Sequence, residues 1–367
     1  MVTGKKNLAL LPNGFVDLLP PVAEHEYRAA GKMMMIFASF GYQRVKPPML
    51  EFEESLFAPG PGESMIDDTF RVMDPVSRRM MGVRSDITPQ IARIACSRLG
   101  KEPRPLRLCY ANDVLRTKAG QQRTERQFCQ VGCEIVGDTG IETDIESCVV
   151  ALVGLKEIGV ENITIDLSFP CIVGELLDRH KVDEDDRAKI KKVLESRAVD
   201  RLKGHNKKLV DALSKLAKAA GPGEKALKAL AALGDFKPDI RKLETIHNGI
   251  ARALNELEFD DVKITIDSIE TRGFKYHSGL GFTIFAAGVS GEIGRGGRYD
   301  IHFGGQDPVE SACGFTLYMD TVRKAMPPAP KRKTVAVNAA EDWSAIRAEQ
   351  RNGTIVIRGK AKEGKKK

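Results

Sequence analysis

Apolar residues recur at helical spacing in the N-terminal third of the chain. In residues 21–41 they stand three or four positions apart, at Met33, Ile36, Phe37 and Phe40, and Gly41 then ends the run. Residues 86–99 show a second helical pattern, with Asp86 as the cap and Pro89 in the first turn. Further helices are predicted at 141–158 and at about 314–325.

Strand-like segments alternate with these helices. Two of them, 106–115 and 128–136, are joined by the polar loop RTKAGQQRTERQ. That loop is too short to hold a crossover helix, so the two strands should be antiparallel. Further strands are expected at 71–83 (two strands and a turn), 162–168, 262–268 and in Gly-rich segments up to 305, whereas 56–68, rich in Gly, Pro, Ser and acidic residues, is predicted to be a mobile loop.

The composition changes in residues 171–258, which are rich in Lys, Glu, Ala and Leu and are divided by Gly221-Pro222-Gly223. We therefore predict an α+β fold, an antiparallel sheet flanked by helices, with a helical insertion to one side. The predicted domains are a core of residues 1–170 and 259–326, a helical insertion subdomain at 171–258, a small strand–helix–strand segment at 331–358 and a basic tail at 359–367.

The positive charge of the chain is concentrated at its C-terminal end. The net charge is +7, and residues 331–367 hold 11 Lys or Arg and 4 Asp or Glu, a balance of +7. The other residues hold 46 of each sign, so the folded body has no basic bias toward nucleic acid. A basic tail of this kind is typical of a solvated end, and a nucleic-acid-binding arm is the alternative.

Cysteine spacing and hydropathy exclude several classes of protein. The seven cysteines form no CxxC pair, which favours free thiols in a reducing cytoplasm over a disulfide framework or a structural zinc site. No stretch has the length and apolarity of a transmembrane helix, and the N-terminal residues make a poor signal peptide. No histidines have metal-ligand spacing, so neither a metal nor a cofactor is expected.

Three groups of residues are candidates for chemistry. Arg116, Arg123 and Arg126 lie in the loop between the antiparallel strands, where guanidinium groups bind phosphate or carboxylate; a solvated basic loop is the alternative. Gln130 and Glu134 share one face of the returning strand and suit a ligand with nitrogen donors, unless they are ordinary exposed sheet residues.

The third group lies in the segments TRGFKYHSG and GEIGRGGRYD, which carry Arg272, Arg298 and His277. Their glycines would let a backbone approach a ligand closely, or serve only as turn glycines beside core aromatics. No helix follows GRGGRYD in the required register, so a dinucleotide-binding loop is rejected.

An ordered series of segments over about residues 8–326, weak in 171–258, resembles histidyl-tRNA synthetase, a class II aminoacyl-tRNA synthetase. GYQRVKPPMLE resembles motif 1 with its proline, Pro48, which implies a dimer. LRTKAGQQRTERQFCQVGCEIVG resembles motif 2, TRGFKYHSG resembles RGLDYY, GGRYD is the family's own string and GFTLYMDTV resembles motif 3. The resemblance implies that Arg116 matches the arginine that holds the ATP α-phosphate, and Arg272 the catalytic arginine. Residues that match the histidine pocket or its surroundings are Thr88, Gln130, Glu134, Tyr276 and Tyr299.

Departures from this family's motifs fall on ATP contacts. The adenine-reading glutamate of motif 2 is Lys118, the motif 3 glycine is Tyr318 and its γ-phosphate arginine is Thr321. Other matched positions also differ, with Asp86, Ile87, Lys275 and His277 in place of the family's residues. Each lost bond to a charged group is worth roughly 1.5–3 kcal/mol, so we expect adenylation to be crippled.

Residues 331–367 are also too few for the anticodon-binding domain of a synthetase, so tRNA binding is not expected. This combination resembles the ATP phosphoribosyltransferase regulatory subunits. That resemblance implies a non-catalytic subunit, in a hetero-octamer with the short catalytic subunit of the first step of histidine biosynthesis. It would be required for activity and for feedback by histidine, a possible ligand. The alternatives are an active histidyl-tRNA synthetase or related amino-acid-activating enzyme, and an RNA-binding protein that uses the basic tail.

Overall fold

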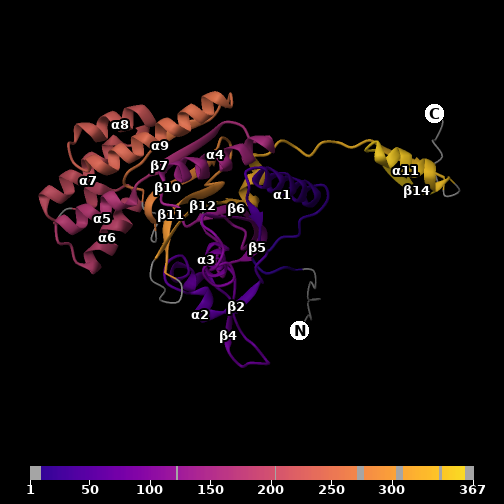
Figure 1. Ribbon diagram of the computed structural model, residues 1–367, viewed down its shortest axis with the longest axis horizontal. Helices are drawn as coiled ribbons and strands as arrows, with labels where there is room; N and C mark the ends of the chain where they lie inside the picture. Colours follow the sequence, from indigo (N-terminus) through magenta and orange to yellow (C-terminus); the bar gives the residue numbers. More distant parts are fainter. Residues whose placement is uncertain are drawn as a thin grey trace, which may run out of the picture. The chain divides into compact units, whose positions relative to one another are not determined.

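The computed structural model describes residues 10–120, 123–202, 204–270, 277–302, 309–338 and 341–359 (Figure 1). The chain divides into two compact units, Met1–Met326 and Pro327–Lys367. Arg272, Tyr276 and Lys275 lie outside the described residues.

Among the described residues, nine strands of the larger unit form one sheet, in the order β1-β5-β6-β12-β11-β10-β7-β9-β8. The strands are β1 (Gln43–Arg44), β5 (Leu106–Leu115), β6 (Gln127–Val136), β7 (Ile163–Ser168), β8 (Gly221–Pro222), β9 (Lys263–Ile266), β10 (His277–Ala286), β11 (Gly294–Ile301) and β12 (Glu310–Tyr318). The pairs are antiparallel except β1–β5 and β7–β9. The predicted sheet is confirmed, and the hairpin β5–β6, next to the edge strand β1, is antiparallel as expected.

Both faces of this sheet are covered by helices. Side chains alternate between the two faces along each strand, so each strand contributes to both cores. On one face, Cys109, Val131 and Cys133 pack into a core with α1 (Val22–Ser39), α4 (Ile141–Glu157) and α10 (Met319–Ala325). On the other face, Leu108, Tyr110 and Phe128 pack into a second core with α3 (Thr88–Ser97). The polar residues of β6 that point toward α3 are therefore shielded from water.

The residues that precede α3 in the sequence form a smaller sheet with the strand order β2-β4-β3. Its strands are β2 (Leu50–Phe52), β3 (Arg71–Met73) and β4 (Met80–Val83). The mobility of 56–68 remains a prediction, but the last part of this stretch forms the 3-10 helix η1 (Glu63–Asp68), which a tight bend joins to α2 (Glu53–Leu56). Gly62 allows it, since a Cβ there would lie 2.5 Å from the carbonyl oxygen of Leu56.

The segment after β7 is mainly helical, as predicted, and Figure 1 shows its helices gathered beside the sheet. They are α5 (Pro170–Arg179), α6 (Glu184–Glu195), the 3-10 helix η2 (Val199–Arg201), α7 (Lys207–Ala219), α8 (Gly223–Ala232) and α9 (Lys237–Glu256). The Gly-Pro-Gly segment is more than a break, because Gly221 and Pro222 extend the sheet as β8. A Cβ at Gly223 would lie 2.3 Å from Nε2 of His247, so this turn requires glycine.

The helix predicted at 314–325 starts later than expected. Residues up to Tyr318 belong to β12, which pairs with both β6 and β11, and only Met319–Ala325 is helical. A buried strand between two neighbours is continuously apolar, so its pattern does not distinguish it from a buried helix.

The smaller unit contains a strand, a helix and a strand, as predicted for 331–358. These are β13 (Thr334–Val337), α11 (Trp343–Arg351) and β14 (Ile355–Arg358), and the two strands are parallel. The domain boundaries proposed from the sequence remain predictions.

Candidate functional site

Gln130 and Glu134 of β6 both point toward α3, as their spacing predicts. They are buried, with 0% and 2% of their surface exposed, and therefore are not ordinary exposed sheet residues. A buried amide and a buried carboxyl need hydrogen-bond partners, and most of those partners come from the start of α3.

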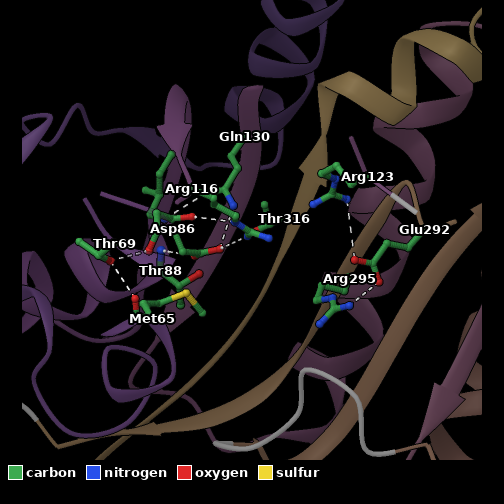
Figure 2. A network of polar contacts seen from close by, with 12 residues as sticks. Met65, Thr69, Asp86, Thr88, Arg116, Arg123, Gln130, Glu292, Arg295 and Thr316 are labelled. Carbon is green, nitrogen blue, oxygen red and sulfur yellow. Dashed lines mark hydrogen bonds and ion pairs between the residues drawn. The ribbon is translucent and has the colours of Figure 1, made fainter. Parts of the chain in front are cut away.

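Gln130 connects β6 to the residues that precede α3 (Figure 2). Its Oε1 accepts a bond of 3.1 Å from the backbone N–H of Ile87, and its Nε2 donates to Oδ2 of Asp86 at 2.8 Å. The other Asp86 oxygen accepts the N–H of Thr88 at 2.9 Å, although the N-cap residue of α3 is Ile87 and not Asp86 as predicted. Arg116 Nη2 lies 3.6 Å from Oδ2 of Asp86. The structure therefore brings together four predicted site residues.

Glu134 lies deeper on the same strand face. The hydroxyl of Tyr299 donates to its Oε2 at 3.1 Å, and Thr88 Oγ1 donates to its Oε1 at 3.4 Å. Burial raises the pKa of Glu134 to about 8, the bond from Tyr299 opposes this and the charge of Asp86 adds to it. Space for the carboxyl depends on Gly314 of β12, where a Cβ would lie 2.0 Å from Oε2.

The strand register adds residues that the sequence did not single out. Asn112 pairs with Gln130 across β5 and β6, is 9% exposed, and its Nδ2 has no hydrogen-bond partner among the described residues. Tyr110 of the same strand shares a hydrogen bond of 2.7 Å with Oγ1 of Thr316 on β12. Alternation along the predicted strand is compatible with Asn112 lying on the same sheet face as Gln130. Only the β5–β6 register shows that the two residues are paired.

Arg126, predicted to bind an anion together with Arg116, is engaged within the chain. Its Nε donates to the carbonyl oxygen of Arg116 at 3.0 Å and its Nη1 to that of Asn13 at 3.2 Å. Its guanidinium also lies over the rings of Phe15 and Phe70. These contacts join the hairpin loop to the N-terminal segment.

A cavity of about 540 Å³ adjoins the hairpin loop. Charged residues of both signs line it in equal number: Arg116, Lys118 and Arg123 against Asp68, Glu125 and Glu292. It therefore has no excess of positive charge to attract a polyanion.

Arg123 lies over two aromatic rings beside this cavity. Its guanidinium carbon is 3.7 Å from the ring centre of Tyr318 and 4.8 Å from that of Phe128, and its Nε lies 3.0 Å from Oδ2 of the buried Asp320. Phe128 and Tyr318 meet edge to face, with ring centres 6.0 Å apart. Burial raises the pKa of Asp320 and the Arg123 charge opposes this.

The ion pairs of Glu292 extend this group, as Figure 2 shows. Arg295 donates a hydrogen bond to Oε2 of Glu292. Nη2 of Arg123 lies 3.8 Å from the other carboxylate oxygen, Oε1. Thr321 is bound internally, since its Oγ1 donates to the carbonyl oxygens of Glu292 at 2.9 Å and Tyr318 at 3.1 Å.

Two residues of the Gly-rich segments have distinct surroundings. His277 lies opposite Tyr299 in the β10–β11 register, and burial together with the charge of Arg295 lowers its pKa to about 3, so its imidazole is neutral. Arg298 bonds to Oδ1 of Asp144 at 2.9 Å, and to Asp138 and Gly140 carbonyl oxygens, which fixes the start of α4 to the sheet.

The described part of the chain contains no group of three or more His, Cys, Asp or Glu side chains arranged to hold a metal ion. No helix within it combines the length and apolarity needed to cross a bilayer. All seven cysteines are free thiols.

Comparisons with known proteins connect this geometry to two related groups. A family model described as histidyl-tRNA synthetase matches residues 14–322. A solved structure from Bacillus halodurans, described as an ATP phosphoribosyltransferase regulatory subunit/histidyl-tRNA synthetase, has a TM-score of 0.83 at 20% identity and covers 99% of this chain and 96% of its own. A histidyl-tRNA synthetase from a Nostoc species has a TM-score of 0.78 at 18% identity, with 97% and 87% covered. The predicted class II synthetase-like fold is confirmed.

Curated relatives distinguish between the two groups. The ATP phosphoribosyltransferase regulatory subunit of Rhodospirillum centenum is 45% identical over 331 residues, which is 89% of this chain and 83% of the relative. That of Paramagnetospirillum magneticum is 41% identical over 363 residues, 98% of this chain and 92% of the relative. The chain belongs to the ATP phosphoribosyltransferase regulatory subunit family.

Proposed function

We propose that this chain is a non-catalytic regulatory subunit that assembles with the short catalytic subunit of ATP phosphoribosyltransferase. It is required for the activity of that subunit in the first step of histidine biosynthesis and carries its feedback by histidine. The observation that supports this most directly is the packing of Arg123 against Phe128, Tyr318 and Asp320. By resemblance, this is where the motif 2-like hairpin and the motif 3-like segment would hold ATP.

Three features disfavour the binding of ATP beside Arg123 and Tyr318. The Tyr318 ring and the Arg123 guanidinium already stack on each other, so an adenine ring would have to displace them. Arg123 is paired with Asp320 and Thr321 is bonded to the backbone, so neither is available for a phosphate. The cavity lining balances in charge, whereas a triphosphate needs an excess of cations.

We propose that the cluster of Asp86, Thr88, Gln130, Glu134 and Tyr299 binds histidine. The cluster offers the Asp86 carboxylate, the Gln130 amide and the Glu134 carboxyl group to the ammonium and imidazole N–H groups of that ligand. By resemblance, Arg272 and Tyr276, which lie outside the described residues, belong to the same proposed pocket together with His277, and Arg116 is its basic residue.

The proposed assembly includes a self-dimer through the motif 1-like segment around Pro48. The partly exposed apolar residues Met49 and Leu50 follow this proline, and β1 just before it is an edge strand of the large sheet. We place the complex in the cytoplasm, consistent with the free thiols, and propose no role for tRNA.

Reconstitution with a short-form catalytic subunit tests the function. Formation of phosphoribosyl-ATP should depend on this chain, and histidine should inhibit the complex. Loss of both effects would refute the proposal. Histidine-dependent ATP–pyrophosphate exchange by this chain alone, at an ordinary enzymatic rate, would instead favour an amino-acid-activating enzyme. Steeply salt-dependent RNA affinity that disappears on deleting residues 359–367 would favour an RNA-binding protein.

A further inference from the structure

The sheet of the C-terminal unit, Pro327–Lys367, has one uncovered face. In its parallel register, Thr334 pairs with Ile355 and Ala336 with Ile357, so these four side chains share one face. All four are exposed, including 37% of Ile355 and 54% of Ile357. Parallel sheets are normally covered on both faces, so this face has the character of a binding surface.

The opposite face is the one that α11 covers. Val335 and Val356 alternate with the exposed residues and are partly buried. Arg358 has the same parity, and its guanidinium carbon lies 4.0 Å from the ring centre of Trp343 at the start of α11. Ile346 of α11 is buried, with 2% exposed. The helix therefore covers only one side, and within the described residues of this unit nothing covers the isoleucines.

Charge indicates what kind of surface fits the uncovered face. Residues 331–367 carry a net charge of +7, and Lys331, Arg332 and Lys333 lead directly into β13. A second copy of the unit would bring +7 against +7, and the body of the same chain is neutral. Nucleic acid would match the charge but would leave the isoleucines against phosphates. An acidic protein surface with an apolar centre matches both properties.

We propose that the uncovered face of the C-terminal unit (Thr334, Ala336, Ile355 and Ile357) binds an acidic, apolar-centred surface of the catalytic subunit. This inference rests on the proposed function, because it names the surface by which the regulatory chain holds its partner. The isoleucines provide the buried centre of the contact, and Lys331, Arg332 and Lys333, which lead into β13, provide positive charge for its rim.

The test compares two charge-matched variants of the full chain. Ile355→Glu with Ile357→Glu places two carboxylates on the uncovered face, and Ala345→Glu with Ala348→Glu places two on the exposed side of α11. Affinity for the catalytic subunit, measured by calorimetry, should fall by about thirtyfold or more for the first pair and by less than about threefold for the second. Emission of Trp343, the one tryptophan of the chain, verifies that the unit remains folded in each variant.

A measurement without variants complements this comparison. Hydrogen exchange at β13 and β14 should slow when the catalytic subunit is added to the unaltered chain. Equal affinities of the two variants, or unchanged exchange in a complex that forms and responds to histidine, overturns this inference while leaving the proposed function intact. If the unaltered chain neither binds nor affects the catalytic subunit, the proposed function fails first. A change only in self-association or in RNA affinity assigns the face to one of those ligands and also overturns the inference.

Discussion

Glu134 shows how a single side chain can make the site sensitive to pH. Its described partners, Tyr299 and Thr88, are hydroxyl groups, and burial raises its pKa to about 8. An unfolded glutamate releases its proton near pH 4.5, so the folded chain holds this proton over the intervening pH range. The contribution of this proton to folding stability is fully present below the pKa of the unfolded state. It is lost as the pH rises through the pKa of the folded state, about 8.

Replacing Glu134 with glutamine should flatten that dependence, because the amide has no proton to lose. Between pH 5 and pH 8 the free energy of unfolding of the unaltered chain should fall relative to Glu134→Gln, with a slope of at most about 1.4 kcal/mol per pH unit. Urea unfolding at several pH values measures this difference, with the exposed Glu142→Gln as control. Parallel profiles for the unaltered chain and Glu134→Gln would contradict the expected burial effect.

Arg123 should matter for stability because its partner is buried. Only 1% of the Asp320 side chain is exposed, so Arg123→Ala would leave a nearly buried carboxylate without its cation and remove the stacking on Tyr318. We expect a loss of about 3–5 kcal/mol in the free energy of unfolding. The exposed pair of Arg252 and Glu256 provides the control, and Arg252→Ala should cost less than about 1 kcal/mol. Similar losses in the two variants, measured by urea unfolding, would show that Arg123 is not a structural partner.

At the scale of elements, the sequence predicts most where the pattern is local. The predicted bounds of the β5–β6 hairpin agree with the structure to within one residue, because alternation and a polar loop define it. The sequence does not reveal the end of β12, because its pairing with β6 and β11 joins residues far apart in the chain. The two-residue strand β8 is not predicted for a similar reason, since it forms only against β9.

The same distinction applies to the candidate site. Period-two spacing places Gln130 and Glu134 on one face without knowledge of the fold. The pairing of Asn112 with Gln130 requires the register, and the contact of Arg123 with Tyr318 joins segments nearly two hundred residues apart. Sequence reasoning therefore identifies which residues are suitable, whereas tertiary structure determines which of them meet.

Strand β12 supports the site through Gly314, and its substitution tests that role. In Gly314→Ala the added methyl group would lie 2.0 Å from Glu134 Oε2 and 2.3 Å from the carbonyl oxygen of Cys133, so the strand or the carboxyl must shift. We expect a loss of about 1–3 kcal/mol in stability and weaker histidine binding. Gly174→Ala in α5 meets nothing within 4 Å and should instead stabilise by up to about 1 kcal/mol. Chemical denaturation and calorimetry with histidine measure both effects; unchanged binding in Gly314→Ala would remove this strand from the proposed pocket.

At the scale of the whole molecule, the two units differ in charge and in core. The larger unit buries two apolar clusters, one on each face of its sheet. Within the described residues of the smaller unit, two strands and one helix bury little beyond Ile346 and Thr354. Stability is not uniform in such a molecule, because a two-stranded sheet with a single covering helix is marginal on its own.

The two units should therefore unfold separately in the free chain. Trp343 lies in the smaller unit and is the one tryptophan of the sequence, so its selectively excited fluorescence reports on that unit alone. Most of the helix lies in the larger unit and dominates circular dichroism. In urea the fluorescence midpoint should come first, because unfolding releases Trp343 from Arg358 before the large sheet opens. Addition of the catalytic subunit should move the fluorescence midpoint upward, since a ligand that binds only the folded unit stabilises it by mass action. Coincident transitions in the free chain would mean that the smaller unit does not unfold independently of the larger one. That result would contradict the proposal that its uncovered face is free to bind another protein.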